Sequence, residues 1–186
     1  MNSITPPPTT ADRLWDGTGG PTLVRPHLRV AEGRIESVQR GLLPPPACTG
    51  TAAHFPGCTI LPGLIDTHVH LVFSAQATNA VIIFQVASES DDQLLQRALD
   101  NARAALAAGI TTVRDCGGKG HIVQQARGRI DAGLAPGPDV LSCGMPITPR
   151  LGHCPWLGLV AESLAEVQAA AERMVAEQAD FLKVMA

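Results

Sequence analysis

The sequence predicts an α/β fold in which the N-terminal half of a (β/α)8 barrel of the TIM type follows a small β-sandwich-like domain. Before residue 61 the chain alternates apolar and polar residues in short runs, which is the period of half-buried strands. Beyond it, strand-like runs alternate with helical patterns, and polar or glycine-rich residues follow each run, as at the carboxyl ends of barrel strands. A complete barrel takes about 250 residues. The 125 residues after Leu61 therefore provide half of one.

The predicted β domain spans residues 11–60 and is incomplete. Residues 1–10 are rich in proline and threonine, and we expect them to be disordered. Alternating segments on both sides of Glu32-Gly33 predict a hairpin with a tight turn. One more short strand is expected over residues 53–60.

The barrel part spans residues 61–186 and is expected to contain strands one to four only. The predicted strands are residues 64–70, 110–115, 140–143 and 181–185. The predicted helices are residues 90–108, residues 120–132, and one that begins at a capping box formed by Ser163 and Glu166. Gly109 is expected to end the first helix. The residues expected to face inward from the last helix are Leu164, Val167, Ala171, Met174 and Val175.

The composition argues against several classes of partner. A net charge of −3 gives no attraction to nucleic acid or anionic lipid, and only 3% of residues are aromatic. No apolar run approaches the roughly 20 residues of a membrane span, and the N-terminus lacks the regions of a signal peptide. The five cysteines show no CxxC spacing, which favours reduced thiols in a cytoplasmic protein over disulfides or a thiolate zinc site.

Two histidines one residue apart end the first predicted barrel strand. Side chains at positions i and i+2 of a strand point to the same face, so His68 and His70 are presented side by side. Such a pair can hold a metal ion, although on the residues alone a structural role is an equal alternative. Asp66 is expected to support the histidines or contact a loop, and Asp115 is expected to bond to nearby loops.

Four blocks of sequence, in this order, resemble the barrel of the amidohydrolase superfamily. The blocks are residues 61–70 with the His-Val-His motif, 108–118, 136–144 continued by 147–156, and 179–186 with Lys183. The chain resembles most closely the imidazolonepropionase-like and Xaa-Pro-dipeptidase-like branch, and the likeness extends over residues 11–186.

The resemblance implies a metal-dependent amidohydrolase that hydrolyses a C–N bond in a small-molecule amide, a cyclic amide or a dipeptide. It implies His68, His70 and a carboxylated Lys183 as ligands of two divalent metal ions, zinc above all, with a metal-bridging hydroxide as nucleophile. Lys183 is then a catalytic residue, whereas the sequence alone favours a solvated ammonium. His153 is expected to contact substrate. Leu151 replaces a glycine of the relatives, at a place where a positive φ would require glycine.

In the superfamily, two further histidine ligands and an aspartate come from strands five, six and eight, which this sequence does not contain. The chain alone would then bind one metal ion or none. Two alternatives to a working enzyme follow. The chain is a catalytically inactive truncated fragment, or it is one half of a split hydrolase that needs a C-terminal half-barrel chain as partner. Assembly into a homo-oligomer is a further expectation.

Overall fold

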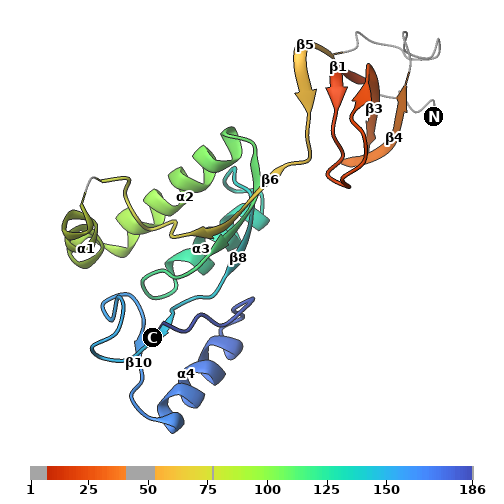
Figure 1. Cartoon of the computed structure of the whole chain (residues 1–186). Coiled ribbons are helices and arrows are strands. Elements are labelled where there is room, and N and C mark those ends of the chain that lie inside the picture. Colours follow the sequence, from red (N-terminus) through yellow and green to blue (C-terminus); the bar gives the residue numbers. More distant parts are fainter. Residues whose placement is uncertain (1–7, 41–52, 77, 186) are drawn as a thin grey trace. The chain divides into compact units, whose positions relative to one another are not determined.

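The computed structural model describes residues 8–40, 53–76 and 78–185, and these form two compact units (Figure 1). The first unit is Met1–Pro62 and the second is Gly63–Ala186. Within the described part of the chain, no helix has the length and apolar character needed to cross a membrane.

The described residues of the first unit form a five-stranded sheet. Its strands are β1 (Thr9–Leu14), β2 (Leu23–Val24), β3 (Pro26–Ala31), β4 (Arg34–Arg40) and β5 (Ala53–Ile60). The expected hairpin is confirmed, because β3 and β4 pair in antiparallel register as far as Ala31 and Arg34. Glu32 and Gly33 between them have φ of 49° and 72°, the left-handed conformation of a tight hairpin turn.

Two expectations for the first unit are wrong. Thr9 and Thr10 are not disordered, because they pair with β3 on one side and with β5 on the other. Residues 1–7 of that predicted segment lie outside the described residues, as does Cys48. The described strands also form one sheet and not a sandwich. Among the residues that the structure describes, β1 is paired along both edges, so its partners extend this one sheet.

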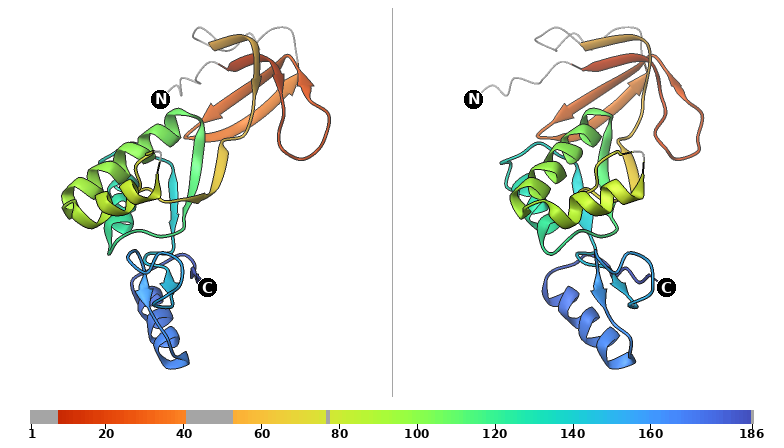
Figure 2. Two further views of the ribbon diagram at one scale, coloured as in Figure 1. Left: turned by 60° about the vertical axis from the view of Figure 1, so that its left-hand side comes forward. Right: turned by 90° about the vertical axis from the view of Figure 1, so that its left-hand side faces the viewer.

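The second unit contains a parallel sheet in the order β6-β7-β8, as the barrel prediction requires. Its elements are β6 (Leu64–Val69), α1 (Asn79–Ser88), α2 (Asp91–Ala107), β7 (Ile110–Asp115), α3 (Ile122–Asp131), β8 (Asp139–Ser142), β9 (Ile147–Thr148), β10 (Leu159–Val160) and α4 (Leu164–Ala176). Figure 2 shows α2 and α3 side by side along this sheet, each in the connection between two neighbouring strands. This is the repeating β-α succession of a barrel.

Helix α2 covers the sheet with the apolar stripe that its sequence predicts. Ser90 caps its first turn through a capping box with Gln93, and Gly109 follows its end with φ of 86°. The stripe residues buried against the sheet and α3 are Leu94, Leu95, Ala98, Leu99 and Ala102. Val113 and Val140, paired on neighbouring strands, complete this core at 0% and 5% exposure. Packing of this stripe, more than helix propensity, therefore fixes α2 on the sheet.

The fourth predicted barrel strand is not formed. Of residues 181–185, only Val184 makes a bridge, which joins it in parallel to Ile147. Asp180 lies against the end of β8, where its backbone N–H donates to the Ser142 carbonyl at 2.8 Å. Between these two points the facing chain contains Gly144 at φ 66° and Pro146, which has no N–H to donate. A continuous ladder therefore cannot form there.

Helix α4 begins at the predicted capping box, but two of its five predicted inward positions are wrong. Met174 is buried, and Val167 and Ala171 pack against the small cluster under the helix. Leu164 and Val175 are instead 85% and 65% exposed. The helix packs on β9 and β10, which are only two residues long each, so only a narrow stripe of it is covered.

A buried carboxylate ties the ends of β6 and β7 together. Asp115, the last residue of β7, is fully buried and accepts the backbone N–H of Leu71 at 2.7 Å and that of Gly117 at 2.9 Å. The expectation that Asp115 bonds to loops is thereby confirmed. Burial raises the pKa of Asp115 to about 6, and the two N–H donors oppose that rise only in part.

Replacement of this carboxylate by Asp115→Asn is expected to destabilise the fold, most strongly near pH 4. The amide nitrogen would face a backbone N–H and leave it without an acceptor, at a cost of about 1–3 kcal/mol. Because the folded pKa of about 6 lies above the unfolded value of 3.8, the wild type loses stability as the pH rises through this interval, by about 3 kcal/mol. The difference between the two proteins should therefore shrink towards pH 7.

Urea unfolding of both proteins at pH 4 and pH 7 measures this difference. The matched control is Asp139→Asn, at an exposed aspartate that begins β8, and it should change little at either pH. An equal pH dependence in the wild type and in Asp115→Asn would contradict the assignment.

Candidate functional site

Two histidines lie side by side where β6 ends. His68 is the penultimate residue of β6 and His70 follows the strand directly. Their ring centroids are 5.4 Å apart. Asp66 accepts the backbone N–H of His68 at 3.1 Å, so its carboxylate supports the strand end from the same chain segment. The strand geometry predicted from the sequence thus brings the two imidazoles together.

The orientation of the His70 ring is set by one hydrogen bond to the loop after β7. Its Nδ1–H donates to the carbonyl of Gly117 at 2.8 Å, which leaves Nε2 with a free lone pair. Gly117 has φ of 141°, and a Cβ there would lie 2.8 Å from the Pro146 ring. Only glycine therefore fits at this position, so the acceptor of His70 depends on a residue without a side chain.

Both imidazoles are held in the neutral state. The pKa of His70 is lowered, chiefly because burial disfavours the charged ring, and further by repulsion from Lys183 and His153. The pKa of His68 is also lowered, by lost hydration first and then by the charges of Lys183 and His70. Neutral imidazole is the form that binds metal ions, so the pair is ready to act as a ligand.

Lys183 lies on the C-terminal segment, next to Val184, which bridges Ile147 of β9. Its backbone carbonyl accepts the N–H of Ile147 at 2.8 Å, and its side chain is half-buried. Its charge contributes to the lowered pKa of both His68 and His70. Two residues earlier, the Phe181 ring lies 3.7 Å from the guanidinium carbon of Arg114 on β7, a cation–π contact that fastens this segment to the sheet.

His153 lies in the loop between β9 and β10. The buried Thr148 hydroxyl donates to the His153 carbonyl at 2.9 Å and so anchors the loop. Leu151 is almost fully exposed, and the left-handed residue of this loop is Cys154, with φ of 53°. The expectation that position 151 requires a glycine conformation is therefore wrong. Gly152 is the constrained neighbour, since a Cβ there would lie 2.7 Å from the Pro149 ring.

A cavity of about 300 Å³ opens beside these histidines. Phe73, Ile82, Ile83, Cys154 and Trp156 form its apolar walls, and Asn79 and His153 contribute its polar groups. Phe73 stacks on His70 with ring centroids 4.6 Å apart, and on Trp156 at 5.8 Å. Our sequence analysis missed this cavity, because α1 is apolar on all sides and shows no helical stripe. The tryptophan that follows His153 by three residues was the available signal.

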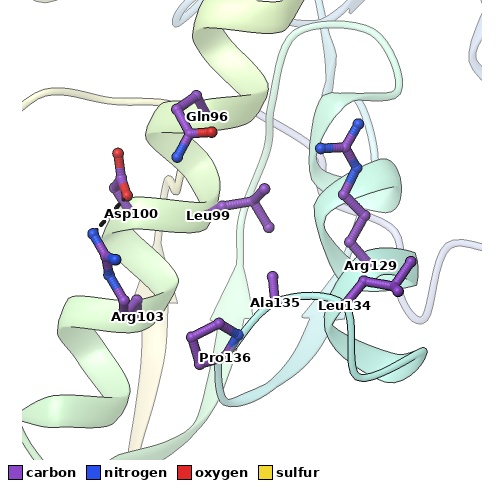
Figure 3. Close-up of a pocket in the computed structure, with 8 residues that line it drawn as sticks. All are labelled: Gln96, Leu99, Asp100, Arg103, Arg129, Leu134, Ala135 and Pro136. Carbon is purple, nitrogen blue, oxygen red and sulfur yellow. Dashed lines mark hydrogen bonds and ion pairs between the residues drawn. The ribbon is translucent and has the colours of Figure 1, made fainter.

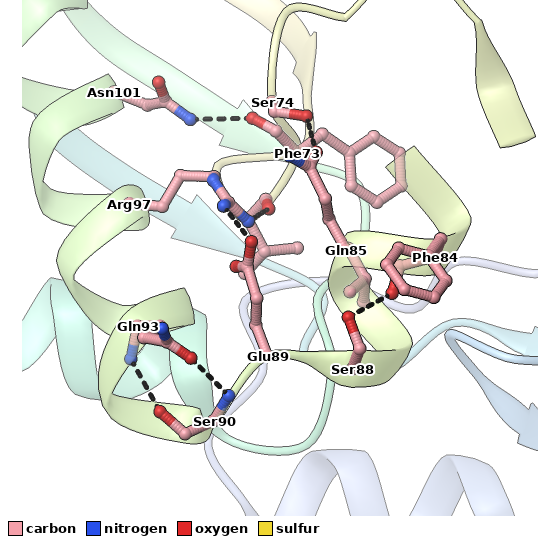
Figure 4. Close-up of polar contacts among 12 residues, drawn as sticks. Phe73, Ser74, Phe84, Gln85, Ser88, Glu89, Ser90, Gln93, Arg97 and Asn101 are labelled. Atoms are coloured by element: carbon pink, nitrogen blue, oxygen red, sulfur yellow. Dashed lines mark hydrogen bonds and ion pairs between the residues drawn. The ribbon is translucent and has the colours of Figure 1, made fainter. Parts of the chain in front are cut away.

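Polar contacts hold the Phe73 wall of the cavity in place (Figure 4). The Asn101 amide donates to the carbonyls of Leu71 and Phe73 at 2.7 and 2.9 Å. The Ser74 hydroxyl donates to Gln85 of α1. The loop after His70 is thus bonded to both α1 and α2.

A larger cavity, of about 530 Å³, lies away from these residues. Figure 3 shows it between α2 and α3, with the ion pair of Asp100 and Arg103 on its rim. It contains none of the predicted site residues, and its walls are formed on the helical side of the sheet. Its size alone therefore gives no reason to prefer it as the functional site.

The residues around His68 and His70 determine whether a metal ion fits here. Over residues 8–40, 53–76 and 78–185, no cluster of three or more histidine, cysteine, aspartate or glutamate side chains could hold one. His68 and His70 nevertheless fit as two ligands, since both are neutral and the Nε2 atom of His70 is free. A third ligand has to come from another type of residue, and Lys183 is the residue whose charge acts on both rings.

Solved structures similar to this chain include several hydrolases. An amidohydrolase is 26% identical, with a TM-score of 0.72. A prolidase complexed with N-methylphosphonate-L-proline and a Xaa-Pro dipeptidase with bound methionine in its active site are each 23% identical, with TM-scores of 0.74. Each match covers 95% of this chain and 46% of the other, so the chain spans less than half the length of these relatives. No curated protein matches the chain.

The family model for the amidohydrolase family matches residues 59–186. This stretch begins just before β6 and contains the two histidines, Lys183 and His153. The resemblance inferred from the four sequence blocks is thereby confirmed. The chain belongs to the amidohydrolase family.

Proposed function

We propose that this chain forms the part of a metal-dependent amidohydrolase that binds two divalent ions, zinc above all, and that the enzyme hydrolyses a C–N bond of a small amide, dipeptide or cyclic amide. The observation that carries the proposal is the pair of His68 and His70 at the carboxyl end of β6 in a parallel sheet. The charge of Lys183, which lowers the pKa of both rings, supports its inclusion. In barrel enzymes the chemistry takes place at that end of the strands.

Each residue has a stated role in this proposal. His68 and His70 ligate as neutral imidazoles, and Gly117 fixes the tautomer of His70. The amine of Lys183 adds to carbon dioxide, which forms an N–C bond and releases a proton, and the resulting carbamate oxygens become ligands beside the two histidines. His153, exposed on its loop, contacts the substrate. Divalent ions bound here would supply Lewis acidity and a nucleophilic hydroxide at neutral pH.

The known ligands of two relatives fit the proposed substrate class. One prolidase was solved with a phosphonate analogue that contains L-proline, and one Xaa-Pro dipeptidase with methionine. Both are apolar amino acids, and the cavity beside His70 has apolar walls. An amide that joins an apolar amino acid to another group is the first substrate to assay.

A second candidate is one half of a split hydrolase, which is favoured by the apolar residues that the second unit exposes. Leu64 and Ile65 of β6 are 53% and 66% exposed, and Leu141 of β8 is 44% exposed. A C-terminal half-barrel chain, or a second copy of this chain, would cover them. Chemical cross-linking at these strands distinguishes the two: bonds to a second polypeptide with histidines at its own strand ends support the split enzyme, and bonds between copies support a homo-oligomer.

Loss of either histidine is expected to remove bound zinc. After dialysis against zinc, the wild-type chain should retain metal, whereas His68→Asn and His70→Asn should each lose at least one equivalent, as measured by mass spectrometry. The control is His54→Asn in the first unit, where the ring forms a hydrogen bond of 2.9 Å with the Thr10 hydroxyl. Equal zinc content in all four proteins would contradict the metal site. Retained zinc without release of amine from any dipeptide or N-acyl amino acid would contradict catalysis by this chain alone.

Carboxylation of Lys183 is expected to give one carbamate signal. The chain contains only two lysines, Lys119 and Lys183, so the assignment is direct. With ¹³C-bicarbonate and zinc, carbon-13 NMR should show a single carbamate resonance that disappears in Lys183→Ala. Lys119→Ala, which removes an ammonium that donates to the Val86 carbonyl at 3.1 Å, should keep it. A signal that persists in Lys183→Ala would contradict the proposed role.

A further inference from the structure

We propose that the cavity beside His70 binds an uncharged apolar side chain of the substrate and so selects amides of aromatic and branched apolar amino acids. The inference rests on the proposed function, because it takes the histidines as the place of reaction. The cavity is lined by Phe73, Ile82, Ile83 and Trp156 from the loop after β6, α1 and the loop before β10.

The cavity lies next to His70, so a side chain bound in it would lie near the two histidines. Phe73 lines the cavity and also contacts the site. Its ring stacks on that of His70, with centroids 4.6 Å apart and an angle of 20° between the ring planes. Its other partner is Trp156, at 5.8 Å and 29°. A substrate group that packs against Phe73 is therefore separated from His70 only by the Phe73 ring. An amide bond next to that group would lie at the two histidines.

The chemistry of the walls decides what the cavity accepts. None of the described residues that line it is an aspartate, glutamate, lysine or arginine, so a charged side chain would lose its hydration there without gaining a partner. Its volume of about 300 Å³ is at the lower end of the range for ligand pockets, about 300–1,000 Å³. One side chain of a small substrate fits this volume, and a folded partner does not. Asn79 and His153 at the same cavity can bond to the polar backbone of that substrate.

The walls are fixed before any ligand arrives. Asn101 holds the Phe73 carbonyl, and Ser74 bonds to Gln85 on α1, the helix that carries Ile82 and Ile83 (Figure 4). On the opposite wall, the Leu157 N–H donates to the Cys154 carbonyl at 3.0 Å in the turn that contains Trp156. A preformed apolar cavity binds with little cost of ordering its own groups, which strengthens discrimination by size.

Trp156 provides a direct readout of binding in the full-length chain. The chain contains two tryptophans, and the other, Trp15, lies in the first unit and is 42% exposed. In a Trp15→Phe background, titration with N-acetyl-L-phenylalanine should therefore change the Trp156 fluorescence saturably. N-acetylglycine and N-acetyl-L-lysine should bind at least about tenfold more weakly, since a missing apolar group or an unpaired charge costs at least that factor. Equal affinity for the three probes would overturn the proposal.

Two matched variants on α1 test the location. Ile83 lines the cavity and is 38% exposed, whereas Val81 on the same helix does not line it and is 42% exposed. Ile83→Glu should weaken binding of N-acetyl-L-phenylalanine about tenfold or more and narrow the gap to N-acetyl-L-lysine. Val81→Glu should leave both affinities unchanged. Equal effects of the two variants would place the binding site elsewhere and overturn the proposal.

The titration needs neither zinc nor turnover, so it separates this inference from the proposed function. Discriminating binding at Trp156 without hydrolysis of any N-acyl amino acid would support the cavity and count against the enzyme activity. Hydrolysis without discrimination between the phenylalanine and glycine derivatives would support the activity and overturn the cavity.

Discussion

The buried carboxylate of Asp115 is the constraint on which the site depends. It accepts one N–H from Leu71, directly after His70, and one from Gly117, whose carbonyl in turn accepts Nδ1–H of His70. The same carboxylate thus fixes the backbone after the histidine and the loop that orients its ring. Burial raises the pKa of Asp115 to about 6, because the two N–H donors offset only part of the cost of removing the carboxylate from water. The fold accepts this cost where the ends of β6 and β7 are bonded to one another through the Asp115 side chain.

From His70 outward, the site consists of short loops bonded to rigid elements. Phe73 is held by Asn101 of α2, and the His153 loop by the buried Thr148 of β9. Each anchor is a side chain that bonds to a backbone carbonyl, so the loop keeps its path whatever side chains it carries. This explains how the rings of His70, Phe73 and Trp156, which come from two separate loops, stay stacked in a row. Binding residues on such loops can vary while the scaffold stays the same.

The sequence predicted the elements whose signals are local and missed those that depend on a partner. The bounds of β5 and β7 were predicted without error, β7 from its β-branched residues, and the predicted capping box at Ser163 marks the start of α4. The strand expected at residues 181–185 failed because its pairing depends on Pro146 in another segment. Leu164 and Val175 were assigned to the core by their period, yet nothing in the described chain covers them.

The candidate site shows the same division between local and tertiary information. The His-Val-His spacing was enough to place His68 and His70 together, since strand geometry fixes residues two apart. The sequence alone could not show that His70 donates to Gly117, or that Phe73 and Trp156 form a cavity, because these contacts join segments more than forty residues apart.

The charges around the histidines bear on the proposed role of Lys183. As an ammonium it repels a positive charge at both His68 and His70, which is one reason why the pKa values of both rings are lowered. The same repulsion would act more strongly on a divalent cation placed between the rings, because the interaction grows with the product of the charges. A cationic Lys183 and a metal ion therefore oppose each other at this site. Carboxylation would replace the cation by an anion and turn the repulsion into attraction, which favours the proposed carbamate over the ammonium beside the histidines.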